Sequence, residues 1–508
     1  MKIWQKLLLV WTVSFLAMPA VWSDSEDDYL KPVSKPPKAK AQRRQGGEAM
    51  PPLPLPATPL RRSEKKRPPS PGVLIGKVIW GGYRDHSWDS GVTARVFDWN
   101  MVPADGQQWL RFLKHFTGME YKVQTVDLNS FSGDPAEVPV LLFSGCRTLH
   151  FTVADRLKLR KYLLDGGMMW FDSVVGSPYF YHSALQAMAA VLPESPIVKI
   201  PPDHPVLRMV KPVGKAVTNK GTLPYPDLDG VYIGSRLAAV ISPYGLGCGL
   251  DEAYPELIPQ AQYYQRATAV PLAADLAAYA VGWFEAGKAY ARPEIYTAKD
   301  TTGDPGKVVF AQLKFQGLWN TDPGAESGFM RFLNKALRMD AGAKTVQVDL
   351  ASATPLDDYP FLYLSGLGDF KLSPAGADKL RRYLNNGGCL LVNNSLGLNQ
   401  FDAAFRHEIA AVLPDAQLER IPADHAILTR GPYAFTSSGF TAPASAKFPG
   451  CNTPLLYGIK TGDRYAVIYS PVDLGGGWTG AFKPGSCAYE PEAAAQLGAD
   501  IITYFVTH

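Results

Sequence analysis

The sequence predicts an α/β fold in which one domain is duplicated in tandem, each copy containing a mostly parallel β-sheet with helices on both faces. Three observations support this prediction. The chain has 508 residues, 46% of them hydrophobic, which is enough for two domains of about 200 residues with sizeable cores. A set of motifs occurs twice at a nearly constant spacing. Short apolar, strand-like runs alternate with helix-like segments, as in parallel sheets.

The internal repeat is the firmest of these observations. Seven motifs recur in the same order at an offset near 220 residues, which is far longer than a solenoid repeat and therefore indicates domain duplication. The paired motifs are Trp99-Asn100-x-x-Pro103 and Trp319-Asn320-x-x-Pro323, Arg111-Phe112-Leu113 and Arg331-Phe332-Leu333, Ser144-Gly145 and Ser365-Gly366, Gly166-Gly167 and Gly387-Gly388 after an Arg-x-Tyr-Leu run, Ala190-Val191-Leu192-Pro193 and Ala411-Val412-Leu413-Pro414, Asp203-His204 and Asp424-His425, and Ser242-Pro243 and Ser470-Pro471.

In the second copy the expected elements follow one another in alternation. Strands are expected at 308–313, 346–350, 361–364, 389–392 and 465–469, and helices at 326–339, 373–385, 400–413 and 491–506. Ser373 and Pro374 are a capping residue and a first-turn proline. Gly387 and Gly388 end the same helix. The strands therefore point the same way, and their carboxyl ends should share one edge of the sheet.

The beginning of the chain is typical of a secretion signal. Lys2 and Lys6 precede an apolar run, 7–18, that is too short to span a bilayer comfortably, and small residues before Asp24 suit cleavage after Ser23. An uncleaved N-terminal anchor is the alternative. We expect an exported protein, periplasmic or extracellular, without a transmembrane helix after cleavage. The expected segments are a signal at 1–23, a disordered Pro/Lys/Arg-rich linker at 24–71, a first domain at 72–292, a linker at 293–306 and a second domain at 307–508.

The net charge of +4 is distributed unevenly. The signal carries +2 and residues 24–71 carry +5, so the remaining residues carry −3. A mildly acidic folded part argues against nucleic acid as a partner. The basic clusters at 61–62 and 65–67 fit either contact with an anionic lipid or polymer or a solvated linker.

The five cysteines are an odd number, and export would permit disulfides. Cys451 and Cys487 flank a glycine-rich segment and are the candidate disulfide pair. Cys389 lies in a strand-like run and is expected to be buried. The sequence leaves the redox state of Cys146, Cys248 and Cys389 open.

Polar residues gather where the predicted strands of the second copy end. Because parallel strands end at one edge of a sheet, these loops should converge, and their glycines would let a ligand approach the backbone. The ligand-binding candidates are Trp319, Asn320, Asp322, Ser365, Gly366, Asn393, Asn394, Ser395, Arg406, Glu408, Asp473, Gly475 and Trp478.

The first copy lacks much of this polar set. The replacements are Val102 for Asp322, Asp172-Ser173 for Asn393-Asn394, Leu185 for Arg406, Ala187 for Glu408, Gly245 for Asp473 and Leu250 for Trp478. We interpret the second copy as a candidate binding domain and the first as a degenerate partner. Ordinary drift of loop sequences is the alternative explanation.

Catalytic templates fit the sequence poorly, and the catalytic residues stay unknown. Cys248, between glycines, has the spacing of a nucleophile elbow but no helix signal after it. Ser395 follows a strand and precedes a helix but has no recognisable His partner. One Asp-His dipeptide per copy, ending in His204 and His425, is too little for a zinc site, and His407-Glu408 lacks a second His. No metal and no cofactor is expected.

Six motifs of the second copy carry a resemblance to a known family. They are Trp319-Asn-Thr-Asp-Pro323, Tyr359-Pro-Phe-Leu-Tyr-Leu-Ser-Gly366, Leu380-Arg-Arg-Tyr-Leu-Asn-Asn-Gly-Gly388, Phe401-x-x-x-Phe405-Arg406-x-Glu408, Asp424-His425 and Ile468-Tyr-Ser-Pro-x-Asp-Leu-Gly-x-Gly-Trp478. Residues 307–508 resemble the bacterial domain of unknown function DUF4159, and residues 73–290 resemble it more weakly. The family usually has an Asp pair where Asn393 and Asn394 stand, which disfavours acid–base chemistry there.

The resemblance implies a flavodoxin-like three-layer sandwich similar to class I glutamine amidotransferases. It does not imply glutaminase activity, because a fold does not settle function and no Cys stands near 393–395, where the nucleophile would fall. Genes for MoxR-type ATPases and von Willebrand-type proteins often accompany the family, which implies a cell-envelope assembly as a partner.

Two functions remain open from the sequence. The first is a non-catalytic binding or scaffold protein of the bacterial cell envelope, whose second copy holds a small polar ligand such as a sugar or peptide. The second is a hydrolase or lyase acting on envelope carbohydrate or peptide, with Asp322 or Asp473 as base and Ser395, Asn393 or Asn394 positioning the substrate. Carboxylates more than roughly 10 Å apart would exclude the second.

Overall fold

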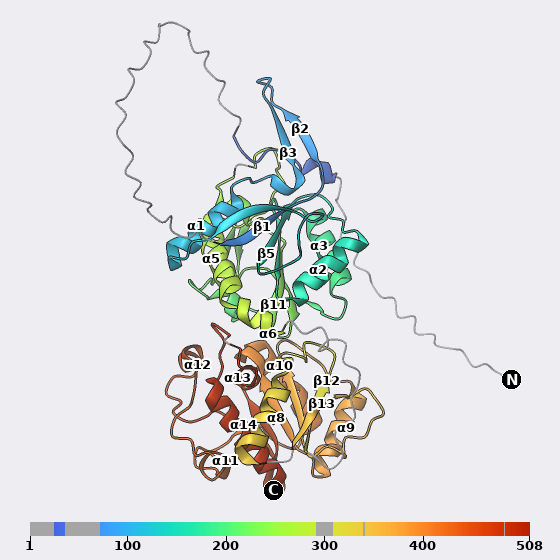
Figure 1. The fold of residues 1–508 in the computed structure, drawn as a ribbon, viewed down its shortest axis with the longest axis vertical. Helices are drawn as coiled ribbons and strands as arrows, with labels where there is room; N and C mark the ends of the chain where they lie inside the picture. The colour runs from blue at the N-terminus through green and yellow to red at the C-terminus, as the bar shows by residue number, and fades with distance from the viewer. Residues whose placement is uncertain are drawn as a thin grey trace, which may run out of the picture.

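Two α/β domains of the same topology are stacked end to end in the computed structural model (Figure 1). The structure describes residues 25–35, 72–253, 255–290, 308–338, 341–481 and 483–507. The predicted secretion signal and most of both predicted linkers lie outside the described residues. Each domain has a seven-stranded, mostly parallel sheet between two layers of helices, which confirms the predicted fold class.

The first sheet has the strand order β4-β1-β5-β6-β11-β10-β7. The first five strands are parallel, in the order of a flavodoxin-like fold, and β10 and β7 extend the sheet antiparallel. The bounds are β1 Val73–Ile79, β4 Lys122–Asp127, β5 Val140–Gly145, β6 Met168–Ser173, β7 Ile197–Lys199, β10 Asp229–Ile233 and β11 Arg236–Ser242.

The second sheet repeats this order as β13-β12-β14-β15-β18-β17-β16. Its bounds are β12 Val308–Lys314, β13 Ala341–Asp349, β14 Leu362–Gly366, β15 Leu390–Asn394, β16 Glu419–Arg420, β17 Tyr457–Thr461 and β18 Arg464–Ser470. The antiparallel pair β16 and β17 is the part that alternation of helices and strands did not predict.

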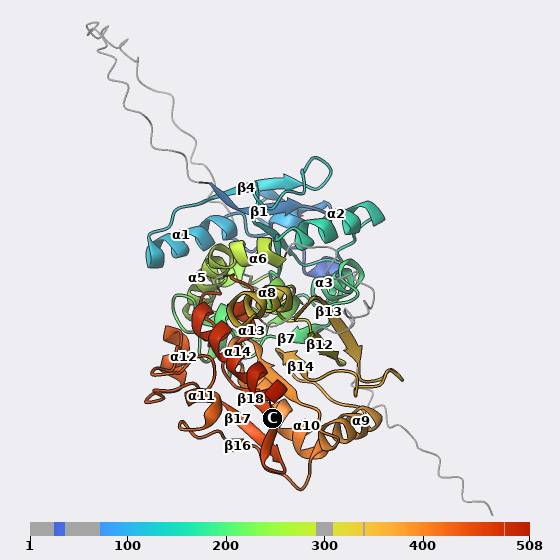
Figure 2. The same cartoon turned by 60° about the horizontal axis from the view of Figure 1, so that its bottom comes forward.

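Helices cover both faces of each sheet, so each domain has two apolar cores (Figures 1 and 2). In the first domain α1 and α5 pack on one face, and α2 and α3 pack on the other. In the second domain α8 and α14 face α9 and α10 across the sheet. The bounds are α1 Asp105–Thr117, α2 Val153–Leu164, α3 Pro178–Val191, α5 Arg266–Gly282, α6 Phe284–Tyr290, α8 Ala325–Leu337, α9 Pro374–Asn385, α10 Asn399–Val412 and α14 Pro491–Thr507.

Short helical turns complete the two domains. They are η1 Glu26–Asp28, η2 Asp98–Asn100, η3 Pro205–Leu207, α4 Gly247–Leu250, η4 Ser395–Gly397, α11 Ala426–Thr429, α12 Ala442–Lys447 and α13 Gly475–Trp478. Among them α4 and α13 occupy equivalent places after the fifth parallel strand, and each lies beside the carboxyl end of its sheet.

The two glycines of the repeated Gly-Gly motif are needed for the same structural reason in both domains. The first glycine of the motif in the second copy, Gly387, has φ +106°, a left-handed conformation that glycine adopts easily. A Cβ on the second glycine, Gly388, would lie 2.2 Å from the ring of Tyr383. That tyrosine donates a hydrogen bond to the carbonyl oxygen of Tyr359 at 2.9 Å and so ties α9 to the segment that leads into β14.

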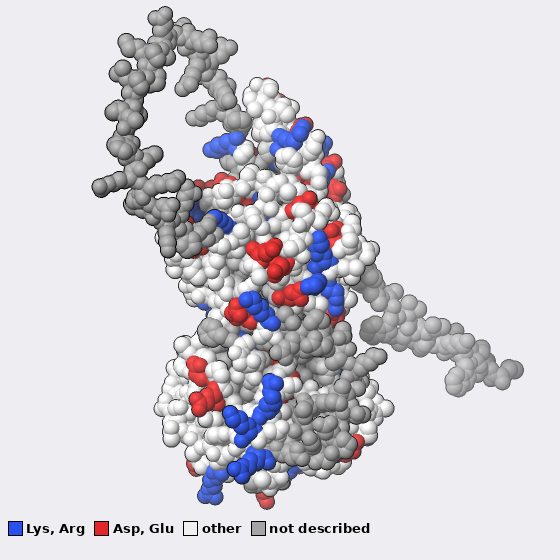
Figure 3. All heavy atoms as spheres, in the orientation of Figure 1, with Lys and Arg blue, Asp and Glu red and all other residues white. Residues whose placement is uncertain are grey.

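Two hairpins distinguish the first domain from the second. The pair β2 (Tyr83–Ser87) and β3 (Thr93–Phe97) projects from the far end of the first domain (Figure 1), and β8 (Ala216–Thr218) pairs with β9 (Gly221–Leu223). In the second domain a short loop after β12 takes the place of the first hairpin. On the face shown in Figure 3, acidic and basic side chains are interspersed over the first domain.

The expectation of a disordered linker over the whole of 24–71 is wrong for residues 25–35. This segment packs against the first domain, where Tyr29, Leu30 and Val33 are buried. The composition of 24–71 concealed this because the segment is short and its three apolar residues are surrounded by charged and proline residues.

The two domains meet over a continuous apolar interface. Leu367, Leu396 and Leu398 of the second domain join the core cluster of α1 and α5 of the first. Trp283 donates a hydrogen bond from Nε1 to the carbonyl oxygen of Pro484 at 3.1 Å. Asp203 accepts one from the backbone N–H of Asn399 at 2.8 Å. The carboxyl edge of the second sheet is thereby covered by the first domain.

The predicted disulfide between Cys451 and Cys487 is not formed, and all five cysteines are free. Cys451 is half-buried and its Sγ lies 3.3 Å from the carbonyl oxygen of Thr453. Cys487 is buried beneath Gly397, where a Cβ would lie 2.9 Å from its Sγ. Each thiol thus has its own local environment, and proximity in sequence to the same glycine-rich segment did not bring the two together.

Within the described residues no single helix combines the length and apolarity needed to cross a membrane. Among these helices, the bent pair of α5 and α6, with 49° between its parts, has the length and composition needed to cross a membrane. Most of α5 is buried in the core of the first domain.

Candidate functional site

A connected polar network lies where the parallel strands of the second domain end. Asn393, at the end of β15, donates from Nδ2 to Ser365 Oγ at 3.1 Å and to Asp473 Oδ1 at 3.0 Å. Its Oδ1 accepts the backbone N–H of Leu474 at 2.7 Å. Thr321 Oγ1 lies 2.6 Å from Ser365 Oγ. Four of the loops expected to converge, those after β12, β14, β15 and β18, therefore share one cluster.

A buried ion pair stands at the centre of this network. Lys483 Nζ pairs with Asp322 Oδ1, and it lies 3.6 Å from Asp473 Oδ2. The side chains of these three residues are at most 3% exposed. Asp473 also accepts the backbone N–H groups of Gly476 at 3.0 Å and Leu396 at 3.1 Å. Both carboxylates reach the same ammonium nitrogen, which places them well within the separation that would exclude a paired-carboxylate site.

Electrostatics keep the lysine of this cluster charged. Burial alone would lower the pKa of Lys483, but the negative charges of Asp322 and Asp473 and the contact with Tyr290 raise it well above its ordinary value. Burial raises the pKa of Asp322, and Lys483 opposes that shift. The neighbouring Glu326 is also buried, which raises its pKa to about 7. The group is therefore an ion-pair network in a dry environment, where removing the lysine leaves two buried carboxylates without a cation.

The first domain closes the network from above. Tyr290, the last residue of α6, donates a hydrogen bond to Asp322 Oδ1 at 3.2 Å. Its hydroxyl also lies 3.2 Å from Ser235 Oγ, in the turn between β10 and β11. Gly234 of that turn approaches the second domain so closely that a Cβ would lie 2.9 Å from Cδ of Pro323. Asp322 and Lys483 are consequently shielded from solvent by a residue of the other copy.

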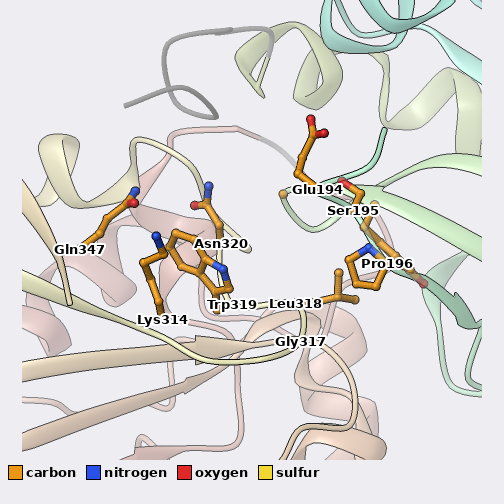
Figure 4. A pocket seen from close by; sticks show the side chains of 11 residues that line it. Glu194, Ser195, Pro196, Lys314, Gly317, Leu318, Trp319, Asn320 and Gln347 are labelled. Atoms are coloured by element: carbon orange, nitrogen blue, oxygen red, sulfur yellow. The ribbon is translucent and has the colours of Figure 1, made fainter. Parts of the chain in front are cut away.

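Two sequence candidates, Trp319 and Asn320, line an open cavity next to this network. The cavity has a volume of about 310 Å³ and lies between the two domains (Figure 4). Lys314, Trp319, Asn320 and Gln347 line one side, and Glu194, Ser195 and Pro196 of the first domain line the other. The ammonium of Lys314 lies 5.4 Å from the centre of the Trp319 ring. A second cavity of about 460 Å³ adjoins it and shares Glu194 and Trp319.

Other candidates serve the fold. Trp478 stacks on Phe329 with ring centres 4.2 Å apart. Gly366 has no room for a side chain, since a Cβ would lie 2.0 Å from the ring of Phe401. The side chain of Asn394 bonds both the N–H and the carbonyl oxygen of Leu398, at 3.0 Å each.

Three further candidates lie apart from the network or make no contact with it. Arg406 pairs with Asp402 one helical turn away, and its guanidinium lies 4.6 Å from the Tyr457 ring. Glu408 accepts the backbone N–H of Leu372 at 2.8 Å. The hydroxyl of Ser395 is buried without a hydrogen-bond partner in the described part of the chain, so no base accompanies it. Gly475, by contrast, lies within the network, where a Cβ would meet Asp322 Oδ2 at 2.8 Å.

Sequence reasoning missed several residues of the network. Lys483 lies in a loop after the glycine-rich segment, and no motif marks it. Tyr290 belongs to the other copy, and only the three-dimensional stacking of the domains brings it to Asp322. Thr321 and Asp322 share a Trp-Asn-Thr-Asp-Pro motif, and that adjacency was the available signal for the threonine.

The first copy has a buried polar cluster of its own. Lys77, on β1, donates to Asp105 Oδ1 at 2.8 Å and to Asn100 Oδ1 at 2.9 Å, and both members of the ion pair are at most 4% exposed. Asp172, which stands in the place of Asn393, accepts the backbone N–H groups of Leu246 and Gly247 at 2.7 and 2.8 Å. Burial raises the pKa of Asp172 to about 7. The first copy therefore has a buried polar network that consists of other residues than the network of the second copy.

The nucleophile-elbow interpretation of Cys248 is disfavoured. The thiol is fully buried, and burial together with Asp172 and Asp105 raises its pKa well above its ordinary value. A thiol held protonated is a poor nucleophile. Among the described residues, no group of three or more His, Cys, Asp and Glu side chains is placed to hold a metal ion.

Comparison with known families gives two matches in one chain. A family model described as a domain of unknown function (DUF4159) matches residues 92–281 and residues 309–506. The two regions cover more than half of the chain and coincide with the two repeated domains, which confirms the resemblance for both copies. The first match begins within the β2–β3 hairpin, so β1 and β2 precede it. No curated protein matches the chain.

Proposed function

The chain belongs to the DUF4159 family, with two copies in tandem, and we propose that it is an exported, non-catalytic binding protein of the bacterial cell envelope. The second copy supplies most of the site for a small polar ligand. The ligand lies in the cavity between the two domains, against Trp319 and Asn320. The single observation that carries this proposal is that cavity of about 310 Å³, because it is open, polar and lined by both copies.

The lining of the cavity suits a sugar or a short peptide. The ring of Trp319 offers an apolar face on which the C–H groups of a sugar or an aliphatic side chain can lie. The amides of Asn320 and Gln347 offer both donors and acceptors. Lys314 supplies a positive charge on one side, and Glu194, which also pairs with Arg160 at 2.7 Å, lies on the other, which fits a neutral or zwitterionic ligand better than a polyanion.

The buried network beneath the cavity supports a binding role over a catalytic one. Lys483 pairs with both Asp322 and Asp473, and Tyr290 closes this cluster off. Their role in this proposal is to fix the loop that carries Trp319 and Asn320. Export rests on the signal-like start of the chain, 1–23, and the envelope as the location follows from export.

A ligand screen by thermal shift tests the proposal. We expect envelope oligosaccharides or short peptides to raise the melting temperature of the intact mature chain. Trp319→Ala and Asn320→Ala should abolish that rise without preventing folding, since both residues lie in a surface loop next to the cavity.

Trp99→Ala is the matched control for this experiment. Trp99 is the counterpart of Trp319 in the first copy and has a similar lysine contact, with Lys77 Nζ 6.0 Å from its ring. It does not line the interdomain cavity. A ligand that still raises the melting temperature of the Trp319→Ala and Asn320→Ala variants would bind elsewhere, and this site would be rejected. The same holds if Trp99→Ala abolishes the rise equally.

A hydrolase acting on envelope carbohydrate or peptide is the second candidate. It is favoured by one observation, the approach of Asp322 and Asp473 to the same lysine together with the raised pKa of Asp322. Substrate could reach these carboxylates only if Tyr290 moved away. Polymer hydrolysis that survives in the Asp322→Asn variant, or no hydrolysis by the intact chain, would exclude this function.

A further inference from the structure

The segment 25–35 lies across the first domain as an extended peptide with one helical turn. It includes η1, which lies next to the β2–β3 hairpin in Figure 1. Tyr29, Leu30 and Val33 are 7%, 1% and 4% exposed. They belong to one apolar cluster with residues of the first domain. The domain's contribution is Val96, Met101, Val102, Cys146, Val174, Val175, Cys248, Ile258 and Ala261.

Polar contacts fix the acidic end of the segment. Asp27 pairs with Arg147 at 2.9 Å, and Glu26 Oε2 accepts both the backbone N–H and the hydroxyl of Thr148, at 3.1 and 2.7 Å. Arg147 also forms a salt bridge with Asp98, at 2.7 Å. Asp98 is the largest influence that raises the pKa of Arg147, so the guanidinium stays charged. The counterpart of Arg147 in the second copy is Gly368, so this anchor belongs to the first copy alone.

The surface that receives the segment lies at the carboxyl edge of the first sheet. Cys146 follows β5, Val174 and Val175 follow β6, and Cys248 lies in α4. Their counterparts in the second copy are Leu367, Ser395, Leu396 and Gly476, of which Leu396 and Gly476 donate backbone N–H groups to Asp473. Val102 stands in the place of Asp322, and Val174 in the place of Ser395. These two apolar replacements therefore contribute to the surface on which Tyr29, Leu30 and Val33 pack.

We propose that the carboxyl edge of the first sheet is a peptide-binding site for a short acidic peptide that carries tyrosine and leucine, and that residues 25–35 occupy it as an intramolecular ligand. This inference concerns the first copy and does not rest on the function proposed for the second. It replaces the view of the first copy as a degenerate partner. The sequence between the segment and β1 is 37 residues long, from 36 to 72, so no short connection forces the segment onto this surface.

The bound segment resembles a ligand in its contacts more than a part of the core. Its backbone pairs with no strand of the described sheets. Its binding consists of an apolar insertion, an ion pair and charge-assisted hydrogen bonds, which is how peptides are recognised by preformed grooves. The capping box of Ser25 and Asp28 gives η1 its turn independently of the domain.

The experiment uses the full mature chain with a protease site placed between residues 36 and 71. After cleavage, a fluorescent peptide with the sequence of residues 25–35 is added and its anisotropy is measured. We expect the labelled peptide to bind at this surface and to be displaced by the unlabelled peptide. The Asp27→Asn and Tyr29→Ala peptides should each bind about tenfold more weakly, since a charge-assisted hydrogen bond or a buried ring contributes about 1.5 kcal/mol or more.

The control peptide carries Lys31→Gln. Among the described residues Lys31 pairs within the segment alone, with Asp28 at 3.8 Å, so this peptide should bind as the parent does. If the cleaved chain keeps its own segment and excludes a large excess of labelled peptide, the segment is an integral part of the fold and the proposal is wrong. Loss of the thermal unfolding transition when the segment departs would overturn it equally.

Discussion

The hydroxyl of Tyr290, in the first copy, donates a hydrogen bond to the Asp322 carboxylate of the second copy at 3.2 Å. This contact joins the last helix of one domain to the buried ion pair of the other. It makes the two copies one structural unit at the point where the second copy concentrates its polar residues. The duplication therefore provides a cover for the carboxyl edge of the second sheet.

Tyr290→Phe removes this hydroxyl and keeps the ring. We expect the free energy of unfolding to fall by about 1–2 kcal/mol, because Asp322 loses one donor while retaining Lys483. Urea unfolding of the intact chain measures this change. Tyr83→Phe, on the exposed hairpin β2–β3, is the control and should leave stability unchanged. Equal stability of the two variants would show that the contact with Asp322 contributes nothing.

Lys483→Met should be among the most destabilising single changes in the chain. It leaves the carboxylates of Asp322 and Asp473 buried without their cation, at an expected cost of about 3–5 kcal/mol. Adding Asp322→Asn to this variant should restore part of the loss, because one uncompensated charge is removed. Lys460→Met, at an exposed pair with Glu419, is the control. A Lys483→Met variant as stable as that control would contradict a buried charged network.

The sequence predicted the elements of the second domain closely because particular residues mark where a helix begins and ends. Ser373 and Pro374 begin α9 where expected, and the helix ends before Gly387, whose left-handed φ no other residue adopts as easily. The antiparallel strands β16 and β17 were not predicted. β16 has only two residues, Glu419 and Arg420, both exposed, so neither alternation nor apolarity marks it.

The candidate site was predicted in part, and the reason is geometric. Asp322, Ser365, Asn393 and Asp473 follow parallel strands, and the direction of those strands is enough to bring them together. Lys483 has no such constraint, because it lies in a loop whose path depends on the interface with the first domain. Contacts between copies, such as those of Tyr290, cannot be read from the order of elements within one copy.

Acidic conditions should stabilise the protein through Asp172. Burial raises its pKa from 3.8 to about 7, so between these values the folded chain binds a proton that the unfolded chain releases. The free energy of unfolding is therefore highest below pH 4 for this group and falls as pH rises through 7, by at most about 4 kcal/mol. In the Asp172→Asn variant, the free energy of unfolding should fall less steeply as pH rises.

Urea unfolding at pH values from 5 to 8 measures this dependence. Asparagine is the residue that the second copy has at this position, where Asn393 accepts the backbone N–H of Leu474, so the variant should fold. Asp89→Asn, in the exposed hairpin, is the control. The same slope in Asp172→Asn as in the parent chain would mean that this carboxyl is ionised in the folded state.

Cys451 should be the reactive thiol of the native chain. It is the one cysteine of the five that is not buried, and a thiol reagent reaches only accessible thiols. Ellman's reagent should titrate about one thiol in the native protein and all five after denaturation, and Cys451→Ser should remove the native signal. A tryptic fragment pair joined through Cys451 and Cys487 would contradict the free state of both.

Asp203 should contribute to holding the two domains together, although it was identified in the sequence only as part of an Asp-His turn. Its carboxylate accepts the backbone N–H of Asn399, the first residue of α10, at 2.8 Å, and it lies 3.5 Å from Lys447 Nζ. A carboxylate at a helix N-terminus is favoured by the unpaired N–H groups and the helix dipole.

Asp203→Ala should lower the free energy of unfolding by about 1–2 kcal/mol and speed proteolysis between the domains. Asp424→Ala is a matched control supplied by the repeat itself, because Asp424 is the counterpart of Asp203 and is exposed. If both variants lose the same stability, the effect belongs to the shared turn and the interdomain contact adds nothing.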